Sequence, residues 1–318
     1  MRSKQSPRSP AVNVGLNPTA KRSTRHSPTV AYNRVLRSSM PVPPNTAAAV
    51  SVIIPWCNRP ELSISLSENM PSFRRAHAEV IVVNCGGDLK ILRHLLRTFW
   101  IQGMRLVNVS HRRFNKSLAL NAGFLVSQGS IVQFLDADII LGRSYFNEAL
   151  TQLPRKAYVT LARVQERGSK PRAQLRSGIS ELAHSITIVR RDRSAQVETN
   201  RVRYGDCSRS APGIVMFRRE SFLCVDGMNS DLQGWGFEDI DFLVRLQLAT
   251  GRPPAQAGCG YHISHDDRHR TFTGKTPQHS ESSNSARCLY NYQHGHFMGT
   301  YQDDIKTLHK LMRTENGV

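Results

Sequence analysis

Short runs of apolar, β-branched residues alternate with helical stretches along the chain from Val50 onward. The first four runs are VSVIIPW (50–56), EVIVVNCGG (79–87), MRLVNVS (104–110) and SIVQFLDADIIL (130–141). They are too continuously apolar for half-exposed strands, which favours strands buried on both faces of a parallel sheet. We therefore predict an α/β fold with a mostly parallel central sheet and helices on both faces.

The second half of the chain is less regular. APGIVMFRRESFLCVDGMN predicts a strand and a helix ending at Gly227, and a Gly-rich loop then leads into an amphipathic helix ending at Gly251. Segment 163–209 holds eleven basic and five acidic residues, and we expect a polar, partly mobile insertion. Segment 264–285 has few apolar residues, and we expect a mobile lid over the ligand site.

Positive charge is concentrated at the start of the chain. The 318 residues carry a formal net charge of +19, and residues 1–49 contribute eight basic and no acidic side chains with seven of the 16 prolines. We expect a disordered basic tail at 1–49, a folded domain at 50–300 and a C-terminal helix or tail at 301–318. The tail could contact an anionic membrane or nucleic acid, or only improve solubility.

Composition excludes several classes of protein. No apolar run approaches the roughly 18 to 20 residues of a membrane helix, which excludes an integral membrane protein. The first residues lack the apolar core of a secretion signal, so we expect a cytoplasmic protein, with peripheral contact at the inner face of the membrane as an option. The six cysteines are scattered without a C-x-x-C pair, which indicates free thiols.

Two carboxylates, Asp136 and Asp138, follow the apolar run SIVQFL and should stand at the carboxyl edge of the sheet, where such folds bind ligands. Carboxylate oxygens suit a hard divalent metal that also contacts a diphosphate. A strand-end aspartate is also a common helix N-cap, so a metal role and a capping role both remain open.

A second acidic pair, Glu238 and Asp239, follows Gly234, Trp235 and Gly236 where a helix should begin. The glycines allow the loop to move, and the indole could pack on the face of a sugar while the carboxylates bind its hydroxyls. The alternative is a core tryptophan followed by an acidic first helical turn.

Two histidines, His262 and His265, are three residues apart and could face one metal ion. A mixed oxygen and nitrogen ligand set suits Mn²⁺ better than a thiolate-rich zinc site would. Other histidines lie nearby, so solvated loop histidines are the alternative.

The segment after the first run contains Pro55, Asn58 and Arg59. Main-chain groups and Asn58 could hold a uracil base there, and the planar fork of Arg59 suits a diphosphate. Taken alone, the segment is also consistent with a simple strand-to-helix turn.

The order and spacing of these motifs, together with RFNKSLALNAGF (113–124), resemble the GT-A glycosyltransferases of the β1,4-galactosyltransferase type and the related bacterial chondroitin-polymerase type domains. The resemblance spans about Val50 to His296 and is weakest at 163–209. It implies a GT-A fold and a transferase that uses a UDP-sugar.

The resemblance also implies roles for single residues. The donor-binding residues would be Pro55, Asn58, Arg59, Phe114, Asn115, Asn121, Gly123 and Asp136. The acceptor-binding residues would be Gly234, Trp235, Gly236 and Glu238, with Asp239 as the catalytic base beside Glu238. The metal ligands would be Asp138, His262 and His265. The resemblance implies Mn²⁺ as the metal. The animal enzymes have Met in place of His262, and a nitrogen ligand is harder than a thioether, which makes the use of Mg²⁺ more plausible here.

We therefore expect an inverting, metal-dependent enzyme that moves a hexose or N-acetylhexosamine (Gal, GalNAc or Glc type) from a UDP-sugar to a hydroxyl of a glycan or glycolipid in surface polysaccharide synthesis. A single carboxylate base with in-line attack implies inversion. One alternative is a basic nucleic-acid-binding protein, but residues 1–49 offer only Tyr32 for base stacking, so no nucleic acid partner is expected. The other alternative is an inactive transferase-like scaffold.

Overall fold

The computed structural model describes residues 49–97, 99, 104–167, 178–265 and 276–316. The expected basic tail, except for residue 49, lies outside the described residues. No helix in the described ranges combines the length and hydropathy that crossing a membrane requires.

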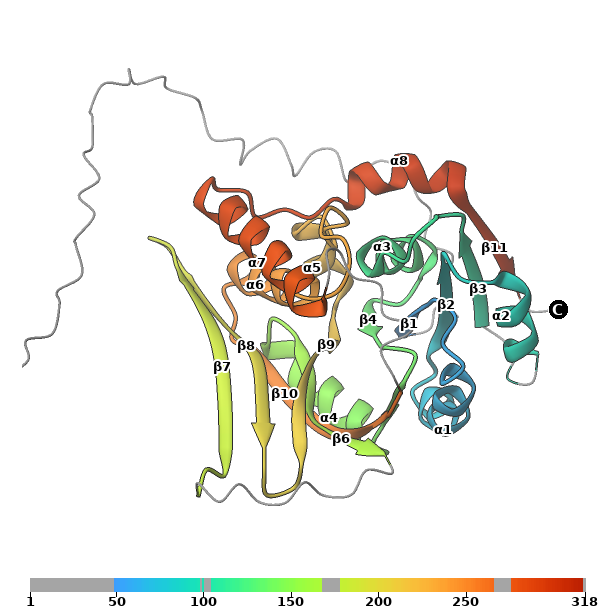
Figure 1. The fold of residues 1–318 in the computed structure, drawn as a ribbon, viewed down its shortest axis with the longest axis horizontal. Helices are drawn as coiled ribbons and strands as arrows, with labels where there is room; N and C mark the ends of the chain where they lie inside the picture. The colour runs from blue at the N-terminus through green and yellow to red at the C-terminus, as the bar shows by residue number, and fades with distance from the viewer. Residues whose placement is uncertain (1–48, 98, 100–103, 168–177, 266–275, 317–318) are drawn as a thin grey trace, which may run out of the picture. The chain divides into compact units, whose positions relative to one another are not determined.

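Eleven strands in the described part of the chain form one mixed sheet (Figure 1). Their order is β11-β3-β2-β1-β4-β9-β6-β10-β5, and β8 pairs with both β9 and β7. The strands are β1 (Val50–Trp56), β2 (Glu79–Cys85), β3 (Met104–Val109), β4 (Ile131–Phe134), β5 (Ile139–Leu141), β6 (Val159–Arg167), β7 (Glu181–Val189), β8 (Ser194–Arg203), β9 (Ser208–Arg218), β10 (Ala255–Ile263) and β11 (Met312–Asn316).

The strands that carry the candidate site run in one direction. Strands β3, β2, β1 and β4 pair in parallel, and so do β6 and β10. Because β9 is antiparallel to both β4 and β6, the two parallel groups point the same way. The predicted α/β fold with a mostly parallel central sheet is confirmed, and the carboxyl ends of these strands meet at one edge.

Helices cover both faces of the sheet. The described helices are α1 (Leu62–Arg75), α2 (Leu89–Leu96), α3 (Lys116–Val126), α4 (Tyr145–Gln152), the short 3₁₀ helix η1 (Leu153–Arg155), α5 (Arg219–Cys224), α6 (Glu238–Thr250), α7 (Pro277–Gln293) and α8 (Tyr301–Leu311).

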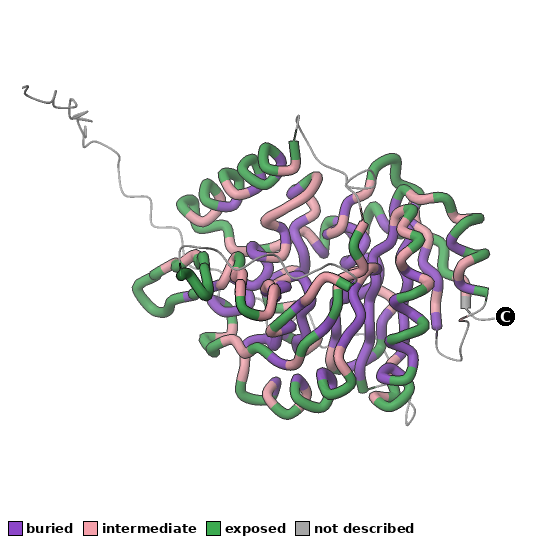
Figure 2. Tube along the Cα trace, turned by 60° about the horizontal axis from the view of Figure 1, so that its bottom comes forward, coloured by how far each residue is buried: buried purple, intermediate pink, exposed green. Residues whose placement is uncertain are grey.

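Alternation of side chains along the strands builds one hydrophobic core on each face. Ile53 and Ile81 pack with residues of α3, α5, α6 and α8, whereas their neighbours Val52 and Val80 pack with residues of α1, α2 and α4. Figure 2 shows the strands largely buried and the outer turns of the helices exposed. The continuous apolar runs of the sequence are thus explained by burial on both faces.

Segments expected to be irregular contain regular structure. In 163–209, the described residues include the end of β6, the β7–β8 hairpin and the start of β9. The C-terminal part forms α8 and then β11, which pairs with β3. The domain limits themselves stay a prediction.

The segment 264–285, expected to be a mobile lid, forms the start of α7 from residue 277 onward, while 266–275 lie outside the described residues. The hydroxyl of Thr276 caps this helix by accepting a hydrogen bond from the His279 N–H. The helix buries Ser280, Asn284 and Cys288, which lie four residues apart on one face. Small polar residues therefore replace the large apolar anchors whose absence suggested mobility.

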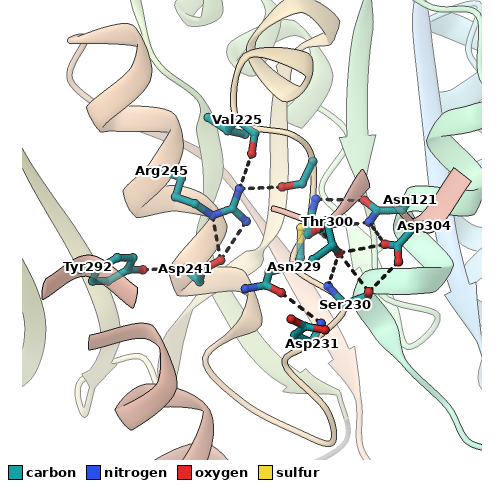
Figure 3. A network of polar contacts seen from close by, with 12 residues as sticks. Asn121, Val225, Asn229, Ser230, Asp231, Asp241, Arg245, Tyr292, Thr300 and Asp304 are labelled. Atoms are coloured by element: carbon teal, nitrogen blue, oxygen red, sulfur yellow. Dashed lines mark hydrogen bonds and ion pairs between the residues drawn. The ribbon is translucent and has the colours of Figure 1, made fainter. Parts of the chain in front are cut away.

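A buried ion pair anchors α6, as Figure 3 shows. Arg245 Nη2 lies 2.8 Å from Asp241 Oδ2, and Arg245 Nη1 donates hydrogen bonds to the carbonyls of Val225 and Gly227. The Tyr292 hydroxyl of α7 donates to the other Asp241 oxygen. Removing one partner would leave an uncompensated buried charge, so this contact fixes the helix whose first residues are Glu238 and Asp239.

Candidate active site

A cleft of about 590 Å³ opens at the edge where β1, β4, β6 and β10 end. Residues far apart in the sequence meet in it. The residues that line it include Pro55, Cys57, Arg59, Phe114, Lys116, Asp136, Asp138, Glu166, Arg209, Gly213, Gly234, Trp235, Gly236, Glu238, Asp239, His262 and His265.

Strand pairing brings Asp138 and the two histidines together. Strand β5 starts directly after Asp138 and pairs with β10, so that His262 lies opposite Ile139 and the Ile263 N–H donates to the Asp138 carbonyl at 2.8 Å. His265 Nε2 lies 2.9 Å and His262 Nε2 3.7 Å from Asp138 Oδ2. One ligand atom from each of the three residues falls within 4.8 Å of the others.

This donor set fits a divalent metal. Burial would raise the pKa of Asp138, but the neighbouring imidazoles of His262 and His265 hold that pKa well below its usual value. A carboxylate oxygen and two imidazole nitrogens therefore face one point of the cleft. An oxygen and nitrogen ligand set of this kind can bind a divalent metal ion.

Lys116 is a site residue that the sequence analysis did not single out. Its ammonium lies 2.9 Å from Asp136 Oδ1 and 3.0 Å from Asp239 Oδ2. Burial opposes its charge, but Asp136 and Asp239 raise the pKa of Lys116 well above its ordinary value. Burial raises the pKa of Asp136, and Lys116 opposes that shift. The available signal was its position directly after the N-cap Asn115, within the 113–124 motif.

The Gly-rich loop sets the start of α6. Gly234, Phe237 and Gly236 have φ angles of 78°, 72° and 99°, in the left-handed region that favours glycine. Helix α7 braces the loop, because Asn284 donates to the Gly236 carbonyl at 2.8 Å and Ser280 Oγ lies 3.1 Å from the backbone nitrogen of Trp235.

Glu238 and Asp239 follow this loop as the first residues of α6. Among the described residues, Oε2 of the buried Glu238 side chain has no hydrogen-bond partner. Burial, followed by the charge of Asp239, raises the pKa of Glu238 to about 7. An unpartnered buried carboxylate oxygen that lines a cleft is suited to accept a ligand hydroxyl.

Four residues expected to bind the donor do not line the cleft. Asn58 Oδ1 accepts a hydrogen bond from the backbone of Asp88, and Asn115 caps α3 and donates to the carbonyl of Ser230. The other two are Asn121 and Gly123. For Asn58 and Asn115, the contacts are with the protein itself, and donor binding stays a prediction.

Asn121 belongs to the buried network of Figure 3, where it exchanges two hydrogen bonds with the backbone of Met228 and donates to Asp304. A side chain at Gly123 would lie 2.3 Å from Ile53 Cγ2, so this glycine lets α3 pack on β1. The N-x-G part of the motif thus holds α3 in place and thereby positions Lys116 at its start.

Glu166 and Arg209 also line the cleft, and they were missed because they lie outside every motif recognised in the sequence. Both fall in the segment expected to be a polar insertion, 163–209. Their place in the cleft depends on the pairing of β6 with β9 and β10, which a single sequence does not reveal.

The sequence profile described as "Glycosyl transferase family 2" matches residues 51–225, and the one described as "N-terminal domain of galactosyltransferase" matches residues 191–266. No curated protein matches the sequence at a significant level. The fold and these matches define the protein as a glycosyltransferase. Because the first profile spans more than half of the chain, the protein belongs to glycosyl transferase family 2.

Several solved structures are similar in fold. A mannosyltransferase from Pyrobaculum calidifontis in complex with GDP-Man and Mn²⁺ is 16% identical, with 87% of this chain and 80% of that chain covered and a TM-score of 0.46. A mutant Drosophila β1,4-galactosyltransferase 7 in complex with manganese, UDP-Gal and xylobiose is 17% identical, with coverage of 72% and 77% and a TM-score of 0.43. S. aureus TarS is 16% identical, with 67% of this chain and 60% of that chain covered and a TM-score of 0.44.

Proposed function

We propose that this glycosyltransferase is an inverting, metal-dependent enzyme that moves a hexose or N-acetylhexosamine from a UDP-sugar to a hydroxyl of a glycan or glycolipid. The observation that supports the proposal is the shared cleft. Asp138, His262 and His265 converge at one point in it, and Glu238 and Asp239 line the same space. Metal-assisted departure of a nucleotide and base-assisted attack by an acceptor need these two groups side by side.

The metal would be held by Asp138, His262 and His265. When bound there, Mn²⁺ or Mg²⁺ supplies positive charge that stabilises a leaving diphosphate. Arg59 and Pro55 line the cleft at the end of β1, where the guanidinium fork can bind phosphate oxygens. Asp136, held by Lys116, would accept a hydrogen bond from the ribose or the donor sugar.

Asp239 would act as the base. Its carboxylate takes the proton of the acceptor hydroxyl, while the hydroxyl oxygen attacks the anomeric carbon and the bond from that carbon to the diphosphate oxygen breaks. In-line displacement inverts the anomeric configuration. Lys116 Nζ lies 3.0 Å from Asp239 Oδ2 and holds this carboxylate in place. Glu238 would orient the acceptor through its unpartnered oxygen, and Trp235 would pack on a sugar ring.

The test is a UDP-release screen of the full-length protein with Mn²⁺ over a panel of UDP-sugars and glycan acceptors. Turnover with one donor that Asp138→Ala abolishes would support the proposal. Release with GDP-sugars but with no UDP-sugar would refute the donor class. Mn²⁺ binding without turnover of any donor would favour the inactive scaffold instead.

We also propose that the enzyme works in the cytoplasm in surface polysaccharide synthesis, with residues 1–49 contacting the anionic inner face of the membrane. The support is the eight basic and no acidic side chains of that segment. Deletion of residues 1–49 should weaken binding to acidic liposomes, in a manner that depends on salt, and leave activity on a soluble acceptor unchanged. Equal liposome binding with and without the segment would refute the contact. The nucleic-acid-binding alternative has only net charge in its favour, and we do not propose it.

A further inference from the structure

The imidazole of His262 lies between two carboxylates. Its Nε2 atom faces Asp138 Oδ2 at 3.7 Å, within the candidate metal site. Its Nδ1 atom lies 2.6 Å from Glu166 Oε2, on the other side of the ring. Each ring nitrogen therefore faces a carboxylate, and of these two carboxylates only Asp138 belongs to the expected ligand set.

The backbone fixes this arrangement. Strand β10 lies between β5 and β6 in the sheet. His262 is the register partner of Ile139 on β5, next to Asp138, and of Glu166 on β6. Glu166 is thus brought to the ring by a ladder of backbone hydrogen bonds and does not depend on a loop conformation.

Glu166 is itself held from two sides. The same oxygen that faces His262 accepts a hydrogen bond from the Ser264 hydroxyl at 2.8 Å. Its other oxygen lies 3.4 Å from Arg209 Nε. The Ser264 hydroxyl and the Arg209 guanidinium are both donors, so Glu166 acts as an acceptor in this arrangement.

An acceptor at Nδ1 selects the form of the histidine. Glu166 Oε2 lies 2.6 Å from Nδ1, whereas Asp138 Oδ2 lies 3.7 Å from Nε2 and beyond hydrogen-bond distance, so the single hydrogen of the neutral ring is on Nδ1. The lone pair is then on Nε2, which points toward Asp138. A ring held in this tautomer and orientation can bind a metal without first rearranging, and partners of this kind also increase the basicity of the ligating nitrogen.

We propose that Glu166 is a positioning residue for the metal site, which presents His262 with its Nε2 lone pair toward the ion. The inference rests on the proposed function, because it takes Asp138, His262 and His265 as the ligands. It assigns a role to a residue of segment 163–209, which the family resemblance covers least well. It also makes metal affinity depend on a carboxylate outside the expected ligand set.

The experiment measures Mn²⁺ binding to the full-length protein by calorimetry and by the electron paramagnetic resonance signal of free Mn²⁺. Glu166→Ala should raise the dissociation constant about 10- to 100-fold. Glu166→Gln should lie toward the lower end of that range, because its amide oxygen still accepts the Nδ1 hydrogen. The matched control is Glu68→Ala. Glu68 is an exposed carboxylate on α1 that pairs with Arg167, the neighbour of Glu166, and its removal should leave Mn²⁺ affinity unchanged.

A second measurement reads the tautomer directly. Long-range ¹H–¹⁵N spectra of the metal-free protein, at a pH where the ring is neutral, should show the Nδ1–H form of His262. Glu166→Ala should shift the ring toward the Nε2–H form. A residue that only supports the fold would change the melting temperature without moving this signal, and if Glu166→Ala does not fold, Glu166→Gln provides the comparison.

The outcomes separate this inference from the proposed function. If Glu166→Ala binds Mn²⁺ within twofold of the wild type and keeps the Nδ1–H tautomer, while Asp138→Ala loses binding, the role of Glu166 is refuted and the metal site stands. If the wild type shows no Mn²⁺ binding that depends on Asp138, the metal site is wrong and the inference falls with it.

Discussion

The guanidinium of Arg59 contacts the ring of His265 on the side opposite Asp138. Arg59 Nη1 lies 2.7 Å from His265 Nδ1, and His265 Nε2 lies 2.9 Å from Asp138 Oδ2. Because a guanidinium can only donate, Nδ1 is the acceptor and Nε2 carries the hydrogen that Asp138 accepts. In that form Nε2 has no free lone pair, so a metal can use it only after Arg59 leaves Nδ1.

Arg59→Met should therefore strengthen the binding of Mn²⁺ alone and weaken the binding of UDP in the presence of Mn²⁺. Loss of one competing hydrogen bond of about 1 kcal/mol corresponds to roughly a fivefold gain in metal affinity, whereas loss of a phosphate contact acts in the opposite direction. Calorimetric titration with Mn²⁺, and then with UDP at saturating Mn²⁺, measures both.

Arg163→Met serves as the control for net charge, because Arg163 is an exposed residue on β6 that pairs with Asp206 and does not line the cleft. An equal gain in Mn²⁺ affinity for both variants would mean that net charge, and not the contact with His265, is responsible. Weaker binding of Mn²⁺ alone by Arg59→Met would contradict the idea.

Asp239→Asn should keep donor binding and lose turnover. The amide preserves shape and can accept a hydrogen bond, but it cannot take the acceptor proton, and removal of a general base typically lowers kcat by about 10² to 10⁴. Steady-state kinetics measure the loss of turnover, and the affinity for UDP measures donor binding. A kcat near that of the wild type would transfer the base role to Glu238.

Gly213→Ala should disturb the Lys116–Asp239 pair. A Cβ atom at this position would lie 2.5 Å from Asp239 Oδ2 and 3.0 Å from Lys116 Nζ, so one of the two side chains must shift. Displacement of a catalytic group lowers kcat by about tenfold or more. Gly205→Ala is the matched control, because its Cβ would meet nothing within 4 Å. If both alanine variants retain wild-type kcat, the position of this pair does not limit catalysis.

Glu238→Gln should stabilise the metal-free protein above neutral pH. The pKa of Glu238 is raised from 4.5 to about 7 in the folded state, so the native protein binds more protons than the unfolded chain in this window. Its contribution to the unfolding free energy therefore falls as pH rises from about 5 to 7, by at most about 3 kcal/mol.

Urea unfolding of wild type and Glu238→Gln at pH 5 and pH 8 measures the difference. The variant should gain relative to the wild type at pH 8, while Glu220→Gln, which changes an exposed carboxyl group on α5, should show no such gain. A constant difference between the two pH values would mean that Glu238 ionises normally.

The sequence alone predicted the elements whose side chains are buried on both faces and the polar residues that lie at the ends of these elements. Strands β1 to β4 are buried on both faces, so their apolar runs identified the strands and indicated that they pair in a mostly parallel sheet. The Asp136 and Asp138 carboxylates follow β4 at the ligand edge, and Glu238 begins α6, as expected. Local signals were sufficient because each of these features is set by residues adjacent in the chain.

The remaining features depend on pairing between distant segments. Glu166 reaches the site only through the register of β6 with β10, and Lys116 acquires its role only when Asp136 and Asp239 approach it from two other elements. Asn121 illustrates the converse, since a motif that suggested a ligand contact holds α3 to Met228 and Asp304. An asparagine in a sequence can bind a ligand or hold a helix in place, and only its three-dimensional contacts distinguish the two roles.

Strand β10 pairs with β5 on one side and with β6 on the other. Because of this double pairing, the metal site forms only when the three strands pair in the correct register. A slip of β10 by one residue would turn His262 to the opposite face and present Tyr261 or Ile263 in its place. Asp138 and Glu166 would then lose their common partner in a single step. A misassembled chain could retain most of its hydrophobic core and still fail to bind a metal, so Mn²⁺ affinity reports the register of three strands as well as the presence of three ligands.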